Sequence, residues 1–141
     1  MRIRTLLAAL ALLPLAAFAQ AGPEGRWKTI DDDTGNAKSI VEISRAANGT
    51  LQGTVVEILQ SDQGPDPVCD KCSGERKDQP IEGMTIIWGM TPKDDDWAGG
   101  TILDPANGRS YRAKMQMHGD DRLGVSGCMV FICREQVWQR E

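Results

Sequence analysis

The four cysteines are the residues of this 141-residue chain whose types and spacing could do chemistry. Two residues separate Cys69 from Cys72, a spacing found in thiol–disulfide oxidoreductases, zinc sites and short structural disulfides. Four residues separate Cys128 from Cys133, whereas a zinc ribbon uses two. An even number of cysteines in an oxidising compartment favours structural disulfides, so the compartment decides between these chemistries.

The N-terminal residues predict export. Arg2 and Arg4 precede an apolar run from Leu6 to Phe18, and Ala17-Phe18-Ala19 matches the small-x-small pattern that signal peptidase accepts. The run is shorter than the ~20 residues that a spanning helix needs. We expect residues 1–19 to be a signal peptide, cleaved near Ala19. Residues 20–141 should then form one periplasmic or secreted domain with no membrane insertion after cleavage.

Export makes disulfides the favoured state of the cysteines, with Cys69 joined to Cys72 and Cys128 to Cys133, although four cysteines allow three connectivities. A separation of five places Cys128 and Cys133 on opposite faces of a regular strand. Their pairing therefore requires a bulge or loop across residues 129–132. A catalytic Cys-x-x-Cys usually begins a helix, and the Pro-rich and Gly-rich flanks of Cys69 and Cys72 offer none.

The other polar clusters give little sign of catalysis or metal binding. Two acidic runs could be considered as calcium sites, Asp31-Asp32-Asp33 and Asp94-Asp95-Asp96. Both lack the alternating ligands and the Gly of an EF-hand loop, and both suit solvated turns. Ser73 follows the Cys-x-x-Cys pair where haem attachment needs His. His118, the one histidine, has no nucleophile near it in sequence. We therefore predict no catalytic residue, no metal and no cofactor.

Strands are expected to position the cysteines and the polar clusters. Short alternating or β-branched runs recur about every ten residues, with turn residues between them, and this pattern predicts strands. Asn48-Gly49 between two such runs is a strong hairpin signal. A long Asp-, Gly- and Pro-rich loop from Gln60 to Gln79 carries the first cysteine pair. The predicted fold is all-β, a small antiparallel up-and-down barrel of about eight strands. The expected strands are 25–30, 38–45, 51–59, 83–90, 97–103, 110–118, 122–125 and a final run ending at residue 140.

Period-two alternation predicts which side chains face the barrel interior. Tyr111, Ala113, Met115 and Met117 share one face of their strand. In the run after Gly83, the inner face is predicted to hold Met84, Ile86, Trp88 and Met90. Such soft side chains suit a packed core and a ligand pocket alike. The candidate ligand-binding lining is Trp27, Met84, Trp88, Tyr111, Met115 and Met117.

The two ends of the barrel sequence resemble lipocalins and the wider calycin group. Gly25-x-Trp27 opens the first strand and Trp138-Gln139-Arg140 closes the last. In calycins a Trp of the first strand is covered by an Arg of the last strand at the closed end of the barrel. The resemblance implies a barrel-closing pair of Trp27 and Arg140, joined by a cation–π contact of roughly 0.5–2 kcal/mol.

Residues 20–141 as a whole resemble a bacterial family, domain of unknown function 2147. The resemblance implies an exported β domain with a Cys-x-x-Cys pair and no established activity. Many members, as the resemblance suggests, carry an aromatic residue and a Gly where this chain has Cys128 and Cys133, which supports an added cross-link here. The matching segments are 25–32, 34–35, 38–41, 69–72, 81–84, 99–105, Gly108, Tyr111 and 138–140.

The net charge of the chain and the predicted barrel together limit the classes of function that the protein could have. The chain has sixteen Lys and Arg and twenty Asp and Glu, and the basic residues are scattered along it. This balance argues against binding to nucleic acid and against attraction to anionic lipid headgroups. We expect a non-enzymatic barrel that binds a small apolar or amphipathic ligand or an envelope partner. One alternative is a thiol–disulfide redox protein that uses Cys69 and Cys72, and another is a structural interaction module.

Overall fold

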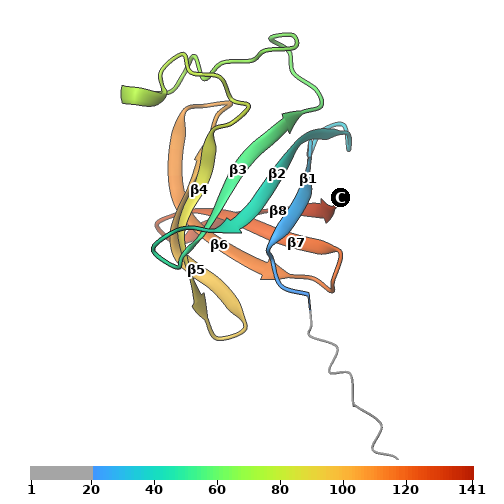
Figure 1. Ribbon diagram of the computed structural model, residues 1–141, viewed down its shortest axis with the longest axis vertical. Helices are drawn as coiled ribbons and strands as arrows, with labels where there is room; N and C mark the ends of the chain where they lie inside the picture. Colours follow the sequence, from blue (N-terminus) through green and yellow to red (C-terminus); the bar gives the residue numbers. More distant parts are fainter. Residues whose placement is uncertain (1–20) are drawn as a thin grey trace, which may run out of the picture.

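Short apolar runs between turn residues fold into eight antiparallel strands, which a computed structural model describes over residues 21–141 (Figure 1). The predicted signal peptide lies outside the described residues. No helix in residues 21–141 is long and apolar enough to cross a membrane. The strands are β1 (Gly25–Ile30), β2 (Ala37–Arg45), β3 (Leu51–Ile58), β4 (Thr85–Lys93), β5 (Asp96–Asp104), β6 (Arg109–Met117), β7 (Arg122–Met129) and β8 (Ile132–Arg140), with a short 3-10 turn, η1 (Gly74–Arg76).

The strands close into a barrel because each pairs with the next and β1 also pairs with β8. Trp27 is opposite Arg140 in that seam, and Lys28 is opposite Gln139. Closure removes the free sheet edges at which other chains could pair. The predicted all-β up-and-down barrel of about eight strands is confirmed.

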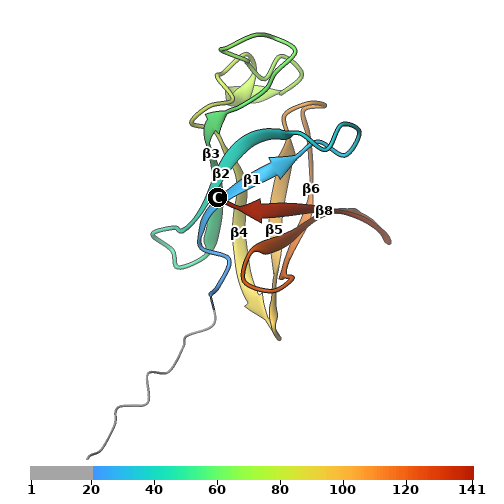
Figure 2. The same cartoon turned by 90° about the vertical axis from the view of Figure 1, so that its right-hand side faces the viewer.

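Up-and-down order sends alternate connections to opposite ends of the barrel. One end, which we call the mouth, carries the connections 31–36, 59–84, 105–108 and 130–131. The other, the closed end, carries residues 21–24 and the connections 46–50, 94–95 and 118–121. The connection 59–84 is the longest, and it rises above the rest of the barrel at the mouth (Figures 1 and 2).

Alternation along β6 places its apolar residues inside the barrel as predicted. Ala113 and Met115 are buried and Tyr111 and Met117 are half-buried, while the intervening polar side chains are exposed. The turn between β2 and β3 also follows its sequence signal. Asn48 and Gly49 connect β2 to β3, with Gly49 at a φ of 85° and the Asn48 side chain accepting a hydrogen bond from the Thr50 N–H.

The inner face of β4 differs from the predicted alternation. A register shift between β3 and β4 brings two successive residues, Ile86 and Ile87, into the core. A bulge of this kind changes the facing of the residue beside it, whereas a second register shift returns Met90 to the core, fully buried as predicted. Trp88 is consequently half-buried rather than part of the inner face, and the guanidinium of Arg76 stacks on its ring at 4.6 Å from the centroid.

Candidate functional site

The mouth of the barrel contains a cavity of about 770 Å³. Its wall is built from the mouth-side halves of the strands and from three of the four mouth connections. The long connection between β3 and β4 contributes residues from Gln60 to Lys71 along one rim. The site is therefore a pocket under the loop that carries the Cys-x-x-Cys pair, at the end of the barrel away from Trp27.

The deep part of the cavity is apolar. Val55, Leu103 and Val125 are nearly fully buried and line the cavity from three different strands. Trp138 is 2% exposed and forms part of the same wall from β8. These side chains offer a ligand an apolar surface with which to exclude water. Other apolar residues that line the cavity include Ile58, Ile81, Ile86, Ile102 and Tyr111.

One wall of the cavity is polar and comes from β8. The Trp138 indole N–H donates to the Gln136 side chain at 3.4 Å, and the Gln136 amide donates to Asp32 at 3.1 Å. Arg134 also donates to Asp32 at 3.2 Å. The three β8 residues alternate with outward-facing ones, so they share the inner face of the strand. A line of hydrogen-bonding groups therefore runs from the cavity floor to the rim.

The β1–β2 connection is held at the rim by Asp31. The Asp31 carboxylate accepts hydrogen bonds from the backbone N–H groups of Thr34 and Asp33 at 2.8 and 3.0 Å, and from the Thr34 hydroxyl at 3.1 Å. Lys38 lies 3.6 Å from the same carboxylate. The Thr34 N–H contributes most to lowering the pKa of Asp31 below its ordinary value, because these donors stabilise the charged form. The polar rim beside the cavity is thus fixed in position.

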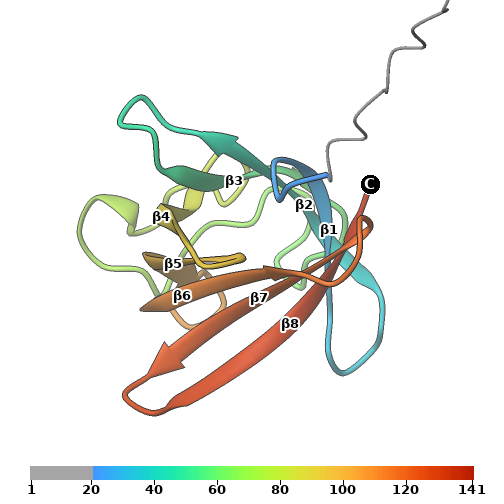
Figure 3. The ribbon, with the colours of Figure 1, turned by 90° about the horizontal axis from the view of Figure 1, so that it is seen from below.

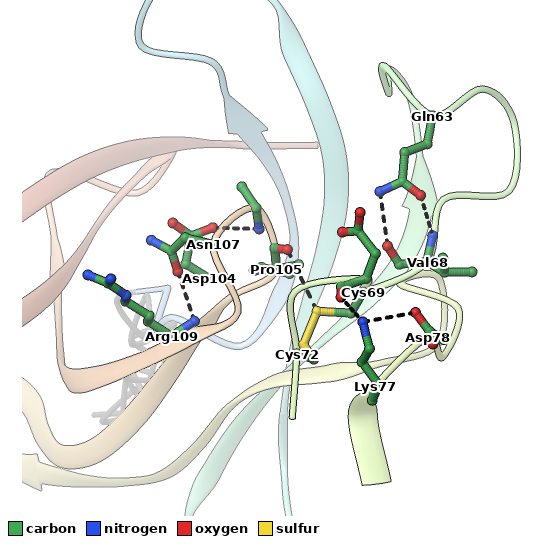
Figure 4. The surroundings of a disulfide bond; sticks show 12 residues. Gln63, Val68, Cys69, Cys72, Lys77, Asp78, Asp104, Pro105, Asn107 and Arg109 are labelled. Atoms are coloured by element: carbon green, nitrogen blue, oxygen red, sulfur yellow. Dashed lines mark hydrogen bonds and ion pairs between the residues drawn. A yellow bond between two sulfur atoms is a disulfide. The ribbon is translucent and has the colours of Figure 1, made fainter. Parts of the chain in front are cut away.

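The disulfide between Cys69 and Cys72 fixes the loop on the opposite rim (Figure 4). The Cys69 sulfur lies 3.6 Å from the carbonyl oxygen of Pro105, in the β5–β6 connection. Gln63 holds the approach to the cysteines, since its side chain accepts from the Val68 N–H and donates to the Val68 carbonyl, both at 3.0 Å (Figure 4). The loop is therefore a restrained part of the mouth.

Gly108 lets the loop pack closely against the β5–β6 connection. Its φ is 70°, and a Cβ added there would collide with the backbone of Lys71. Glycine is the residue that permits both the backbone conformation and this close approach. The two connections consequently form one continuous rim.

Both predicted disulfides are present, Cys69 to Cys72 and Cys128 to Cys133. The second pair is bridged across the β7–β8 hairpin, where Cys128 and Cys133 are direct cross-strand partners and a two-residue turn separates the strands. This turn is the loop between Cys128 and Cys133 that their separation of five residues was predicted to require. Cys69 and Cys72 are 0% and 5% exposed, and burial denies an attacking thiolate the access that redox catalysis needs.

The six predicted lining residues separate into different environments. Tyr111 lines the cavity, and its hydroxyl accepts a hydrogen bond from the Asn107 amide at 3.0 Å. Met84 and Met115 are buried in the packed core, and Met117 is half-buried against it. The other two are Trp27, at the closed end, and Trp88, under Arg76.

The polar wall was missed by reasoning from the sequence, although a signal for it exists. Ile132, Arg134, Gln136 and Trp138 occupy alternate positions of the last strand. Their shared face could have been found by the same period-two reading that was applied to residues 110–118. Asp32, their partner at the rim, carries no such signal, because a turn position reveals nothing about a strand 100 residues later.

The remaining chemical candidates of the described chain do not form a catalytic cluster with the cavity. His118 lies 3.2 Å from Glu135, and both side chains are partly exposed to solvent. Neither residue lines the cavity. Within residues 21–141, no three His, Cys, Asp or Glu side chains lie close enough together to hold a metal ion.

Residues 25–140 match a family described as an uncharacterized protein conserved in bacteria (DUF2147). The chain belongs to this family. The match covers the whole barrel, from the first residue of β1 to the last of β8. The resemblance that the sequence motifs indicated is therefore confirmed.

Among solved structures, a Helicobacter pylori protein described as belonging to the lipocalin family is similar to this DUF2147 chain. The TM-score is 0.72 at 13% sequence identity, and the match covers 86% of this chain and 84% of that one. At this identity the likeness establishes a shared lipocalin-like fold. No curated protein sequence matches the chain.

Proposed function

We propose that this protein is a non-enzymatic, exported binding protein that holds one small amphipathic molecule in the mouth of its barrel. The observation that carries the proposal is the cavity of about 770 Å³, which falls within the ~300–1,000 Å³ typical of ligand sites. Eight strands also give a barrel interior of the width that holds one small ligand. The cavity favours a small ligand over an envelope protein as the occupant.

The distribution of side chains in the cavity suggests how such a molecule would lie. An apolar tail would contact the deep wall, which includes Val125 and Ile102. A polar head would reach Arg134 and Asp32 at the rim, where their charges are partly exposed to water. Apolar contact would supply most of the affinity, and the few polar groups would orient the head.

Two disulfides support an oxidising location for this binding protein. Together with the predicted signal peptide, they support a periplasmic or secreted site of action. The lipocalin family assignment of the structural neighbour agrees with a binding role, although that assignment describes the other protein.

Native mass spectrometry of the protein purified from its own host would test the proposal. We expect a one-to-one adduct of a few hundred daltons that organic solvent removes. Ile102→Trp should abolish the adduct by filling the cavity. Thr101→Trp is the matched control, because Thr101 precedes Ile102 on β5 and points to the other face of the sheet.

Retention of the adduct by Ile102→Trp would place the ligand elsewhere on the protein and overturn the proposal. A wild-type protein that carries no adduct, and gains none on incubation with long-chain fatty acids, amines and lysolipids, would do the same. Circular dichroism of both variants checks that the barrel remains folded.

A further inference from the structure

The β7–β8 hairpin ends in four consecutive apolar side chains, Met129, Val130, Phe131 and Ile132, which we call the hairpin tip. They are 59%, 72%, 96% and 78% exposed, respectively. Figure 3 shows the hairpin of β7 and β8 extending past the neighbouring strands, so nothing in residues 21–141 covers its end. A contiguous, protruding apolar segment on a protein surface marks an interaction site.

The turn at the hairpin tip places a β-branched residue in a backbone conformation that disfavours it. Val130 has a φ of 50°, a region that a β-branched side chain seldom occupies. Two-residue hairpin turns normally use Asn or Gly there. A valine at this unfavourable backbone position indicates that its side chain serves a purpose other than making the turn.

The hairpin tip is also held rigid at its base. The Cys128–Cys133 disulfide joins the two strands directly behind it. From β6, the Arg112 guanidinium donates a hydrogen bond to the Val130 carbonyl at 2.8 Å. A pre-ordered apolar segment loses little conformational freedom when it binds, which favours binding through few side chains.

We propose that the hairpin tip inserts shallowly into the interfacial region of a lipid bilayer, in contrast to the sequence-based expectation of no membrane insertion. A second copy of this chain is a poorer occupant on grounds of area. Four side chains that each cover about 150 Å² would bury less than the ~800 Å² per partner of a stable protein interface. Apolar side chains that insert about 5–10 Å into the boundary between headgroups and acyl chains can bind a bilayer without burying such a large area.

The charges behind the hairpin tip are compatible with lipid phosphates. Arg112 and Arg134 flank the disulfide, on β6 and β8. Arg134 is 80% exposed and forms an ion pair with Asp32. Because the chain is acidic overall, the apolar side chains supply the binding and these two arginines add a modest preference for anionic lipid.

Docking in this way would turn the cavity toward the bilayer, because Met129 and Ile132 both belong to the hairpin tip and to the cavity wall. The proposal does not depend on a ligand in the cavity. It is tested by lipid binding alone, so its failure would leave the proposed ligand-binding function standing.

The test is flotation of the full chain with vesicles of phosphatidylethanolamine and phosphatidylglycerol at a ratio of 3:1. Replacing Val130-Phe131 by Asn-Gly (V130N and F131G together) supplies the preferred turn residues, so the variant should fold at least as well as the wild type. We expect its apparent partition coefficient to fall by about tenfold or more. Val137→Ser is the matched control, since Val137 is an exposed apolar residue of β8 outside the hairpin tip.

Three results would overturn the proposal. The wild type could fail to float with the vesicles, or the Asn-Gly variant could float equally well. Alternatively, the wild type could form a dimer in solution that the Asn-Gly variant does not, which would assign the hairpin tip to contact between copies. Blue-shifted fluorescence of Phe131→Trp, quenched by brominated lipid, would support insertion directly.

Discussion

The guanidinium of Arg140 lies 4.1 Å from the centroid of the Trp27 ring and covers it at the closed end of the barrel. The same guanidinium donates hydrogen bonds to the carbonyls of Asp120, Glu24 and Gly22 at 2.6, 3.2 and 2.9 Å. The Trp27 indole N–H donates to the Pro23 carbonyl at 2.8 Å. One arginine of the last strand therefore joins the first strand, the N-terminal residues before it and the β6–β7 turn.

Arg140→Ala should lower the free energy of unfolding by about 2–3 kcal/mol, because the substitution removes the cation–π contact and leaves three carbonyls without their charged donor. In a domain of this size the midpoint of thermal unfolding should fall by roughly 10 °C. Arg26→Ala is the control, because Arg26 pairs with Glu141 on the outer surface of the same seam and should matter little. Equal midpoints for the wild type and Arg140→Ala would contradict the role given to this residue.

Gly108→Ala should separate the two connections that form the rim of the mouth. Gly49→Ala is the matched control, since Gly49 also has a positive φ but has no neighbouring atom within 4 Å of an added Cβ. We expect Gly108→Ala to cost about 1–3 kcal/mol more than Gly49→Ala in urea unfolding. Amide hydrogen exchange in residues 60–80 should also become faster in Gly108→Ala alone. A similar cost for both variants would mean that the contact with Lys71 is unimportant.

The architecture of this protein could be predicted from its sequence because local signals and tertiary demands agree. Glycine- and Asp-rich turns mark where each strand ends, and alternation in β6 marks which side of Tyr111 and Met115 faces inward. Trp88 was misplaced because a bulge depends on the pairing of β3 with β4, and that pairing has no signal in either strand.

The site was harder to predict because alternation gives the face of a strand but not the depth along the barrel. Met115 and Tyr111 share one face of β6, yet Met115 lies in solid core while Tyr111 reaches the cavity. The difference depends on the stagger between neighbouring strands, which the whole barrel determines. The contact of Asp32 with Arg134 depends on it too.

Asp32 and Arg134 should set the preference of the cavity for the charge of a ligand. Asp32→Asn leaves the charge of Arg134 unbalanced, so binding of dodecanoate should tighten by about two- to fivefold and binding of dodecyltrimethylammonium should weaken. Arg134→Gln should do the reverse. Isothermal titration calorimetry with both ligands checks the prediction, and the double variant should bind nearly as the wild type does. Parallel changes for the two ligands would show that the pair acts on shape rather than on charge.

Protonation of Asp31 should loosen the β1–β2 rim at low pH. Hydrogen bonds from Thr34 and Asp33 lower the pKa of Asp31 in the folded protein, so its charged form stabilises the fold above the ordinary aspartate pKa of about 3.9. This contribution is lost as the pH falls through the lowered folded-state pKa. The difference in unfolding midpoint between the wild type and Asp31→Asn should therefore be constant near neutral pH and shrink below about pH 4.

Asp95→Asn, in the β4–β5 turn at the closed end, controls for the loss of one surface carboxylate. Because Asp31 lies beside the cavity, its protonation should also speed the release of a bound ligand at acidic pH, and Asp31→Asn should release the ligand faster at pH 7 without unfolding the barrel. Stopped-flow dissociation of a fluorescent fatty acid measures both rates. The wild type and Asp31→Asn could instead release the ligand at the same rate at every pH. That result would show that the β1–β2 rim turn does not retain the ligand and contributes only to local stability.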